Sequence, residues 1–341
     1  MIDQMLLERY VASRAFLEAL GAPEGSAVTL SPLGQGEYNL NYRFARPATG
    51  QPLVLRINTG SQMGLDDQIG YEYAALQNLA PSGRTPCPLF CDGSKAILPY
   101  GVLVMEWLPG RALRYETDLP QAAEILADIH ALPVPNRSRL IRPRQPARSI
   151  YDECLSMVEH YFTWDRADRQ IWRLLGELIA EVGRLPLSVP TPAPACMVNT
   201  ELNAGNFLIQ DGGRSHLVDW EKPLISEPAQ DLGHFLAPTT TFWKTDTILT
   251  PAEIAGFMEG YVRAVDGRFD TTSLRERLPL YFTVTCLRGV TWCAMALREY
   301  EQPGRALTNE DTLKKIRAYL TEDFLGHILE HYVRRDFLRE I

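Results

Sequence analysis

The sequence predicts an α+β protein, with a small β-rich part at its start and a larger, mainly helical part after it. Short segments between residues 28 and 107 alternate apolar and polar side chains with the period of strands, and the patterns after residue 108 have the period of helices. The chain of 341 residues is also long enough for two separate hydrophobic cores. We therefore expect an N-terminal domain at residues 1–107 and a C-terminal domain at residues 108–341.

The composition is that of an ordinary globular protein, with 45% apolar and 22% charged residues. A net charge of -8 argues against nucleic acid or an anionic membrane as a partner, and it is compatible with a cationic substrate. The sequence starts without a signal-peptide pattern, and we find no apolar run as long as a membrane span. The six cysteines lack metal-binding spacing, so we expect free thiols and a cytoplasmic location. The oligomeric state is left open.

The first elements predicted are one helix and three strands. Residues 2–20 have an amphipathic helical pattern that ends at Gly21. The three strand segments are residues 28–30, 38–44 and 53–57. Gly34 and Gly36 lie between the first two strands, where backbone amides can approach a phosphate because no Cβ interferes. A plain hairpin turn explains the same two glycines.

The next segment combines an apolar helical stripe with one acidic side chain. Glu72 falls on the stripe formed by Leu65, Ile69, Leu76 and Leu79. A carboxylate in an apolar interface costs several kcal/mol unless it is paired. Side chains alternate between the two faces of a strand, so Arg56 on the third strand points away from the face that Leu55 and Ile57 share. It could therefore be the partner of Glu72. The alternative is a Glu72 at the rim of the helix that bends out to water.

Two more strands are predicted at residues 96–98 and 102–105, and residues 106–110 end the β-rich part. Thr250 and Glu253 form a capping box. The main helical patterns cover residues 119–132, 250–265, 274–300 and 310–337.

Two positions after residue 220 have alternative interpretations. Asp231 could cap the helix that follows it, or it could bind the backbone amides of a polar turn earlier in the chain. Trp243 lies in a predicted threonine-rich loop, where it could belong to the core or line a substrate site.

The most informative stretch is residues 197–220. A polar turn at 199–206 precedes a predicted hairpin at 207–218, which delivers Asp219 to its far end. We expect Glu201, Asn206 and Asp219 to converge, which would bring together one possible base and two oxygen ligands for a hard cation. The alternative is a hydrophilic hairpin with solvated turns.

An acidic residue, four intervening residues, an Asn and then an Asp after a hairpin have the spacing of a kinase catalytic loop and its metal-binding Asp. Together with the features above, the sequence resembles the aminoglycoside phosphotransferase and choline kinase-like family over residues 28–235. The resemblance implies the two-lobe protein-kinase-like fold, with an antiparallel sheet in the small lobe. It also implies ATP and Mg2+ as cofactors, and transfer of the γ-phosphate to a hydroxyl of a small molecule such as an amino alcohol, aminoglycoside or sugar.

The resemblance assigns a role to each position that matches the family's pattern. Gly34 and Gly36 would lie over the phosphates. Arg56, oriented by Glu72, would hold the α- and β-phosphates. The adenine-binding hinge would be formed by Met105, Glu106, Trp107 and Leu108.

In the second part of the motif, Asn206 and Asp219 would bind Mg2+, and Asp231 would brace the catalytic loop. The family usually has His-Gly-Asp where this sequence has Asn199, Thr200 and Glu201. The presumed base is thus a Glu, whose extra carbon displaces the carboxylate by ~1.5 Å, and a misplacement of about 1 Å can cost about 100-fold in rate. Asn199 would support the site in place of the His.

Three classes of function follow from these departures. Phosphoryl transfer relies mainly on the metal and on positioning, so an active kinase with Glu201 as base is our principal hypothesis. The second class is a pseudokinase, which would bind nucleotide without transferring phosphate and act as a regulatory module. The third is a structural protein in which the motif spacing is accidental. The acceptor molecule cannot be predicted from the sequence.

Overall fold

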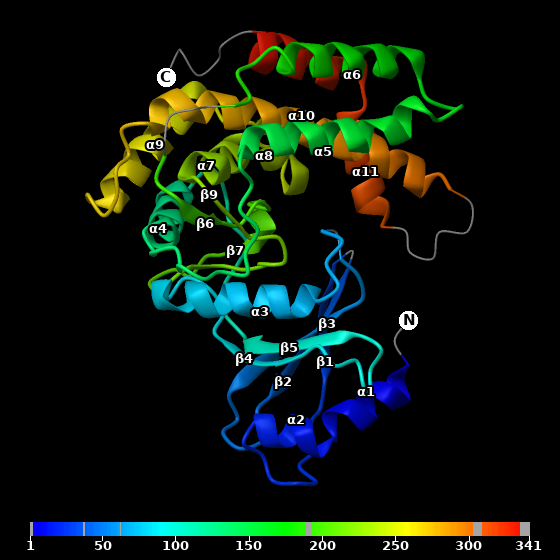
Figure 1. The fold of residues 1–341 in the computed structure, drawn as a ribbon, viewed down its shortest axis with the longest axis vertical. Helices are drawn as coiled ribbons and strands as arrows, with labels where there is room; N and C mark the ends of the chain where they lie inside the picture. The colour runs from blue at the N-terminus through cyan, green and yellow to red at the C-terminus, as the bar shows by residue number, and fades with distance from the viewer. Residues whose placement is uncertain (1–2, 37, 62, 189–192, 303–308, 335–341) are drawn as a thin grey trace. The chain divides into compact units, whose positions relative to one another are not determined.

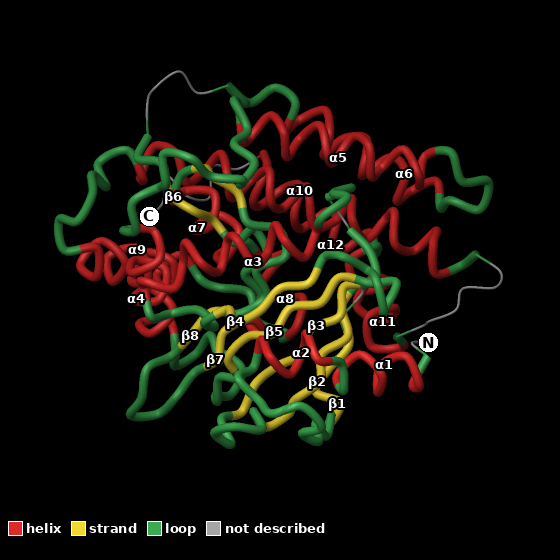
Figure 2. The backbone as a smooth tube through the Cα atoms, turned by 60° about the horizontal axis from the view of Figure 1, so that its bottom comes forward, coloured by secondary structure: helices red, strands yellow, loops and turns green. Residues whose placement is uncertain are grey.

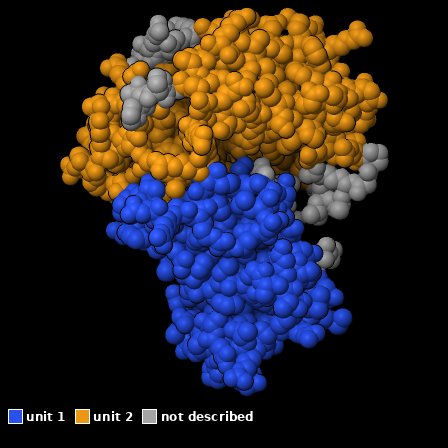
Figure 3. All heavy atoms as spheres, in the orientation of Figure 1, with its two compact units in different colours: residues 1–112, 132–141, 206–223 blue, residues 113–131, 142–205, 224–341 orange. Residues whose placement is uncertain are grey.

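The computed structural model describes residues 3–36, 38–61, 63–188, 193–302 and 309–334 (Figure 1). The chain divides into two units, which Figure 3 draws in blue and orange. The first unit comprises residues 1–112, 132–141 and 206–223, and the second comprises residues 113–131, 142–205 and 224–341.

The first unit is built on an antiparallel sheet, whose strands lie side by side in Figure 2. In chain order the strands are β1 (Ser31–Gln35), β2 (Asn39–Ala45), β3 (Pro52–Asn58), β4 (Pro88–Asp92) and β5 (Gly101–Glu106). Their order in the sheet is β1-β2-β3-β5-β4. The central strands β3 and β5 are almost entirely buried.

Two strand predictions were wrong. The first strand covers residues 31–35 instead of 28–30, so that Gly34 lies within β1 and pairs with Asn41. The predicted strand at 96–98 is a bend, and the strand next to β5 is β4, which begins at Pro88. Pro88 fits there because β4 is an edge strand, and the first residue of an edge strand needs no N–H for the ladder.

The predicted helix at 2–20 is two helices, α1 (Gln4–Val11) and α2 (Arg14–Ala19), and Ile2 lies outside the described residues. The break occurs because the Ser13 hydroxyl accepts a hydrogen bond from the Phe16 amide and starts a new helix. Gly21 follows α2 with a φ of +64°, which favours glycine. Leu7 and Phe16 carry the apolar faces of α1 and α2 into the core on one side of the sheet.

Helix α3 (Gln68–Leu79), followed by the short η1 (Ala80–Ser82), packs against β4 and β5. Asp67 caps it by accepting a hydrogen bond from the Gly70 amide at 3.0 Å. Leu65 therefore precedes the helix, so its predicted place on the helical stripe was wrong, whereas the other four stripe residues are buried in α3.

The second unit is mainly helical. Its elements are α4 (Leu119–His130), α5 (Pro146–Phe162), α6 (Arg169–Val182), α7 (Pro228–Leu236), α8 (Pro238–Lys244), α9 (Pro251–Val265), α10 (Leu274–Tyr300), α11 (Glu310–Tyr319), α12 (Glu322–Ile328) and the π-helical η3 (Leu329–Arg334). Strand β6 (Cys196–Val198) pairs with β9 (Leu224–Ser226).

The predicted helices at 250–265 and 274–300 are confirmed, and the capping box of Thr250 and Glu253 is formed. The predicted helix at 310–337 is divided, because Thr321 caps a new helix, and its last residues lie outside the described part of the chain. Trp243 lies in α8 instead of a loop, where its ring packs edge-on against Trp292 at 5.2 Å. That contact favours the core interpretation of Trp243.

Helix α10 is the scaffold of the second unit, and it packs along α5 and α7. Among the described helices, it alone is long and apolar enough to cross a membrane, a condition that we did not expect any segment to meet. Of its most apolar window, 67% is buried inside the protein. Burial of this kind is usual for a core helix.

Candidate active site

Arg56 is the centre of a buried polar cluster in the first unit. Its Nη1 donates to Glu72 Oε1 at 2.5 Å and to Asp219 Oδ1 at 3.1 Å, and its Nε donates to Asn41 Oδ1 at 3.0 Å. The Glu72 side chain is only 1% exposed. The predicted pairing of Arg56 with Glu72 is therefore confirmed, and the alternative of a Glu72 that reaches water is wrong.

The alternation of β3 explains how Arg56 reaches this position. Leu55 and Ile57 enter the core shared with α1 and α2, so Arg56 points to the opposite face, against which α3 packs. Asn41 lies opposite Arg56 in the register of β2 and β3. We did not predict Asn41 as part of the site, although the pairing of the two predicted strands could have identified it.

The charged groups in this cluster shift the pKa values of Glu72 and Arg56. Burial raises the pKa of the Glu72 carboxyl, the Arg56 charge lowers it and Asp219 raises it, with a net rise to about 7. Burial lowers the pKa of Arg56, but Glu72 and Asp219 outweigh it and raise the pKa above its ordinary value. Arg56 therefore stays charged. Glu72 Oε2 is buried without a hydrogen-bond partner among the described residues.

Asp219 and Asn206 lie at the ends of one hairpin. Strands β7 (Phe207–Leu208) and β8 (His216–Leu217) pair as predicted, and the Val218 amide donates to the Asn206 carbonyl at 2.8 Å. The backbone of Asp219 is left-handed, with a φ of +64°, which is uncommon for a residue other than glycine. The hairpin thus brings the two predicted metal ligands to neighbouring backbone positions in the first unit.

A second polar group continues from this hairpin. The Glu221 carboxylate accepts a hydrogen bond from the Asn39 amide, and its backbone carbonyl accepts one from Gln68 Nε2 at 2.6 Å. The Asn58 amide donates to Asn39 Oδ1 at 2.9 Å. Sequence patterns did not identify these residues, because isolated Asn and Gln side chains in strands and helices have no distinctive spacing.

The two glycines predicted to lie over phosphates are in different settings. Gly34 lies in β1, whereas the Gly36 amide donates to the Asn39 carbonyl at 2.9 Å and so closes the turn toward β2. Neither has a positive φ, and a Cβ added at either position would meet no atom closer than 3.9 Å. Neither local packing nor backbone strain therefore accounts for these glycines.

The predicted hinge begins at the end of β5, which contains Met105 and Glu106. The Trp107 amide donates to the Pro52 carbonyl at 3.3 Å, and the Arg43 guanidinium stacks over the Trp107 ring at 4.0 Å. Leu108 follows as a half-buried residue outside the sheet. The adenine-binding role of this segment stays a prediction.

The remaining predicted residues lie in the second unit, where Asp231 holds a polar turn. From the first turn of α7, Asp231 accepts hydrogen bonds from the Asn199 amide at 2.8 Å and from the Thr200 amide at 3.0 Å. Asn199 Oδ1 accepts from the Glu201 amide at 2.9 Å. Of the two interpretations of Asp231, the structure supports the one in which it binds the turn. Glu201 is half-buried, and its predicted convergence with the hairpin residues stays a prediction.

Two residues that we did not predict extend this network. His130 Nε2 lies 3.3 Å from Asp231 Oδ2, and His130 Nδ1 lies 2.8 Å from the Tyr261 hydroxyl. Burial raises the pKa of Tyr261, and the nearby Cys196 and Asp231 raise it further. Because a carboxylate can only accept, the ring proton of His130 belongs on Nε2, facing Asp231, and Nδ1 can then accept from the Tyr261 hydroxyl.

Taken separately, the two units carry different chemistry. The first unit carries a buried cation beside carboxylate and amide oxygens, which suits a polyanion with a hard divalent ion. The second unit carries a carboxylate on a turn that is fixed by buried hydrogen bonds, which suits a general base.

Comparison with solved structures identifies the fold. A choline kinase from Cryptosporidium parvum Iowa II superposes with a TM-score of 0.64 at 12% identity, over 99% of this chain and 100% of that chain. For a choline kinase from Streptococcus pneumoniae, the TM-score is 0.59 and the identity 16%, over 95% and 98% of the two chains. For a spectinomycin phosphotransferase in complex with ADP and spectinomycin, the values are 0.57 and 14%, over 89% and 92%. At these identities the likeness shows the kinase-like fold, with a small antiparallel-sheet lobe and a larger helical part.

Comparison with curated proteins finds no sequence match. The model of a protein family does match, over residues 29–276, which is most of the chain. The chain therefore belongs to the phosphotransferase enzyme family.

Proposed function

We propose that the protein is an ATP- and Mg2+-dependent phosphotransferase, which moves the γ-phosphate of ATP to a hydroxyl group of a small molecule. The observation that carries the proposal is the Arg56 cluster, in which a buried guanidinium is held by Glu72 and also contacts Asp219. Burying a charge of this kind lowers the stability of the folded protein unless the charge is paired. Kinases use a pair of a cationic side chain and a Glu to hold nucleotide phosphates.

The residues of the first unit fit the cofactors. Asp219 and Asn206 offer carboxylate and amide oxygens, the donors that Mg2+ prefers, and Asp219 is 32% exposed and so open to a ligand. When bound, the ion supplies positive charge that neutralises the β- and γ-phosphate oxygens. At Gly34 and Gly36 the backbone could lie close to the phosphates, in keeping with the open space where their side chains would be.

In this mechanism Arg56 binds the α- and β-phosphates, and Glu72 keeps its guanidinium in one orientation. Glu201 orients the acceptor hydroxyl or takes its proton as the hydroxyl oxygen bonds to the γ-phosphorus and the bond from that phosphorus to the bridging oxygen breaks, which releases ADP. Asp231 and Asn199 fix the backbone on either side of Thr200, so they limit where the longer Glu201 side chain can reach.

The acceptor class that we propose is an amino alcohol, an aminoglycoside or a sugar-like molecule. The solved structures with this fold include choline kinases and a spectinomycin phosphotransferase. A cationic acceptor is also compatible with the net charge of -8.

The test is a screen for ATP consumption with Mg2+ and each acceptor class. We expect consumption with at least one class. Glu201→Gln keeps the size of the side chain and should lower turnover by about 100-fold or more, with little change in nucleotide affinity. Asp219→Asn should abolish the Mg2+-dependent part of nucleotide binding. Equal turnover in the Glu201→Gln protein would remove Glu201 from the mechanism.

A second candidate is a nucleotide-binding protein that does not transfer phosphate, because Asn199, Thr200 and Glu201 depart from the usual catalytic sequence of the family. Binding of Mg·ATP without consumption with any acceptor would favour it. Absence of nucleotide binding would exclude both candidates.

A further inference from the structure

Arg288 on α10 is the charged residue next to the polar turn that has no role so far. Its Nη1 donates to the Thr200 carbonyl at 3.5 Å. Burial lowers the pKa of Arg288, but the charges of Glu153 and Glu201 outweigh burial and raise the pKa above its ordinary value, so the guanidinium stays charged. All four residues belong to the second unit.

The turn needs support because its backbone is strained. Thr200 has a left-handed φ of +69°, a backbone conformation that is unfavourable for a β-branched residue. The amides of Asn199, Thr200 and Glu201 all donate to side-chain oxygens of Asp231 or Asn199. The N–H side of the turn is thus fixed, and Arg288 contacts the carbonyl on its other side.

The Arg288 guanidinium forms hydrogen bonds with two partners, Glu153 and Thr200. Nε donates to Glu153 Oε2 at 3.0 Å and Nη2 donates to Glu153 Oε1 at 3.5 Å, which anchors Arg288 to α5. Nη1 is left for the turn. The planar fork of Arg can serve both partners at once, whereas the single ammonium of Lys cannot.

We propose that Arg288 is a positioning residue of the catalytic turn, which fixes the peptide between Thr200 and Glu201 and thereby orients the Glu201 carboxylate. The contacts of Arg288 with Glu153 and Thr200 do not depend on any assigned function. Their consequence for catalysis rests on the function proposed above. The hydrogen bond to Thr200 is long, so the charge of the guanidinium carries most of its attraction for the carbonyl.

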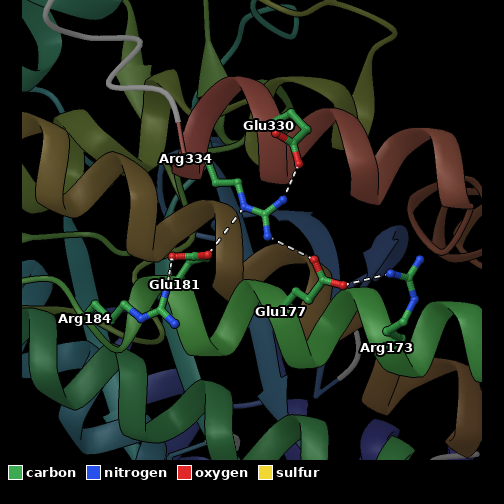
Figure 4. Close-up of polar contacts among 6 residues, drawn as sticks. All are labelled: Arg173, Glu177, Glu181, Arg184, Glu330 and Arg334. Carbon is green, nitrogen blue, oxygen red and sulfur yellow. Dashed lines mark hydrogen bonds and ion pairs between the residues drawn. The ribbon is translucent and has the colours of Figure 1, made fainter.

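The competing explanation is that Arg288 only joins α5 to α10. The same unit offers a matched control for it, the cluster around Arg334 in Figure 4. Arg334 binds Glu177, Glu181 and Glu330 at 3.0, 3.4 and 2.5 Å and so joins η3 to α6. In the part of the chain that the structure describes, Arg334 forms no hydrogen bond or ion pair with the turn at 199–201.

The experiment compares amide hydrogen exchange in full-length Arg288→Lys, Arg334→Lys and wild-type protein. We expect exchange in the peptide that contains residues 199–201 to rise about 10-fold or more in Arg288→Lys and to stay unchanged in Arg334→Lys. Unchanged exchange in Arg288→Lys, or an equal rise in both variants, would overturn the proposal.

If Arg288→Lys does not fold, the same exchange measurement is made on Glu153→Gln, which weakens the hydrogen bonds that hold Arg288 on α5. A rise confined to residues 199–201 supports the proposal, and no rise or a general rise overturns it.

Turnover tests the catalytic consequence separately. With Mg·ATP and an acceptor from the screen, Arg288→Lys should lower kcat by about 10- to 100-fold and leave the KM for ATP unchanged, because the turn is displaced and the nucleotide-holding residues are not. If the wild type consumes no ATP with any acceptor, the proposed function is wrong. The hydrogen-exchange measurement still tests whether Arg288 holds the turn at residues 199–201. If the wild type is active and kcat is unchanged in Arg288→Lys, the positioning role is wrong.

Discussion

Thr200 stores local strain where the family usually has glycine. Its left-handed backbone costs on the order of 1–3 kcal/mol, and a glycine would release that strain at an entropic cost of about 0.5–1 kcal/mol. Thr200→Gly should therefore raise the free energy of unfolding by about 1 kcal/mol, measured by urea denaturation. Thr163→Gly is the control, because Thr163 has an ordinary φ of -92° and should lose stability on the same change. A loss of stability in Thr200→Gly would mean that the hydrogen bonds of the turn depend on the threonine.

His216 predicts how the first unit responds to acid. Burial lowers the pKa of its imidazole, and the charges of Arg84 and Arg214 lower it further, while Nδ1 is buried without a hydrogen-bond partner among the described residues. The unfolded chain takes up the proton near pH 6.5 and the folded protein only at lower pH. The free energy of unfolding should therefore fall as the pH drops below about 6.5, until the lowered pKa is passed.

Melting temperatures at pH 7.5 and 5.5 measure this effect. His216→Phe should lose less stability on acidification than the wild type does. The exposed His160, changed to Gln, should behave like the wild type. An identical loss in His216→Phe would assign the acid sensitivity to other groups.

Single residues of the site differ in how far the sequence could identify them. Arg56 and Glu72 could be paired because each is a charged residue in an otherwise apolar pattern, and such residues need partners. Asn41 could have been identified only from the register of the two predicted strands, where it lies opposite Arg56. Glu221 could not be identified, because polar residues in loops are common and carry no such requirement. Arg288 was missed because an Arg within a long helix is ordinary until its neighbours from other elements are known.

At the scale of elements, the contact between α7 and α10 is limited by one glycine. A Cβ on Gly233 would lie 2.6 Å from the Phe282 amide nitrogen and 2.7 Å from the Tyr281 carbonyl carbon, and backbone atoms cannot move aside easily. Gly233→Ala should cost about 1–3 kcal/mol of stability through overpacking. Because α7 also carries Asp231, the same shift should lower turnover.

Gly256 on α9 is the matched control. A Cβ added there meets no atom within 4 Å, so Gly256→Ala should stabilise the protein by up to about 1 kcal/mol through helix propensity alone. Chemical denaturation of both variants gives the comparison. Equal effects of the two substitutions would show that α7 can move away from α10 without cost.

The elements that could be predicted are those with an explicit boundary signal. The capping box at Thr250 fixed the start of α9, and the hairpin turn before His216 fixed β7 and β8. The predicted helices at 2–20 and 310–337 were too long, because apolar periodicity continues across Ser13 and Thr321. In both cases a hydroxyl side chain starts a new helix, and such residues are also common on exposed helix faces.

At the scale of the whole molecule, the segment that carries the predicted site residues passes through both units. Asn199 and Asp231 belong to the second unit, and residues 206–223 between them belong to the first. The hairpin groups with the sheet unit because its backbone bonds to Arg84 and Arg111, as in the Ile209 amide to Arg111 carbonyl bond of 2.7 Å. A single boundary near residue 108 cannot describe this arrangement, since long-range backbone pairing leaves no mark in local composition.

Nucleotide binding is the property that should change the stability of the whole molecule. A ligand that binds only the folded protein stabilises it by about 2.7 kcal/mol at a concentration of one hundred times Kd. We expect Mg·ATP to raise the melting temperature, and ATP with a chelator to raise it less, because Asp219 and Asn206 would then lack the ion that we propose they bind. Arg56→Met should reduce this shift in melting temperature with or without the ion, since it removes the charge that we propose binds phosphate.

Asp219→Asn separates the two contributions. It should remove the difference between Mg·ATP and chelated ATP and keep the part that depends on Arg56. Arg268→Lys, a change to an exposed ion pair with Asp128 in the second unit, should leave both shifts as they are in the wild type. If Asp219→Asn kept the full Mg2+-dependent shift, the ion would have to be held by other residues. The proposed Mg2+-binding role of the residues at the ends of the β7–β8 hairpin would then be wrong, whichever acceptor the protein uses.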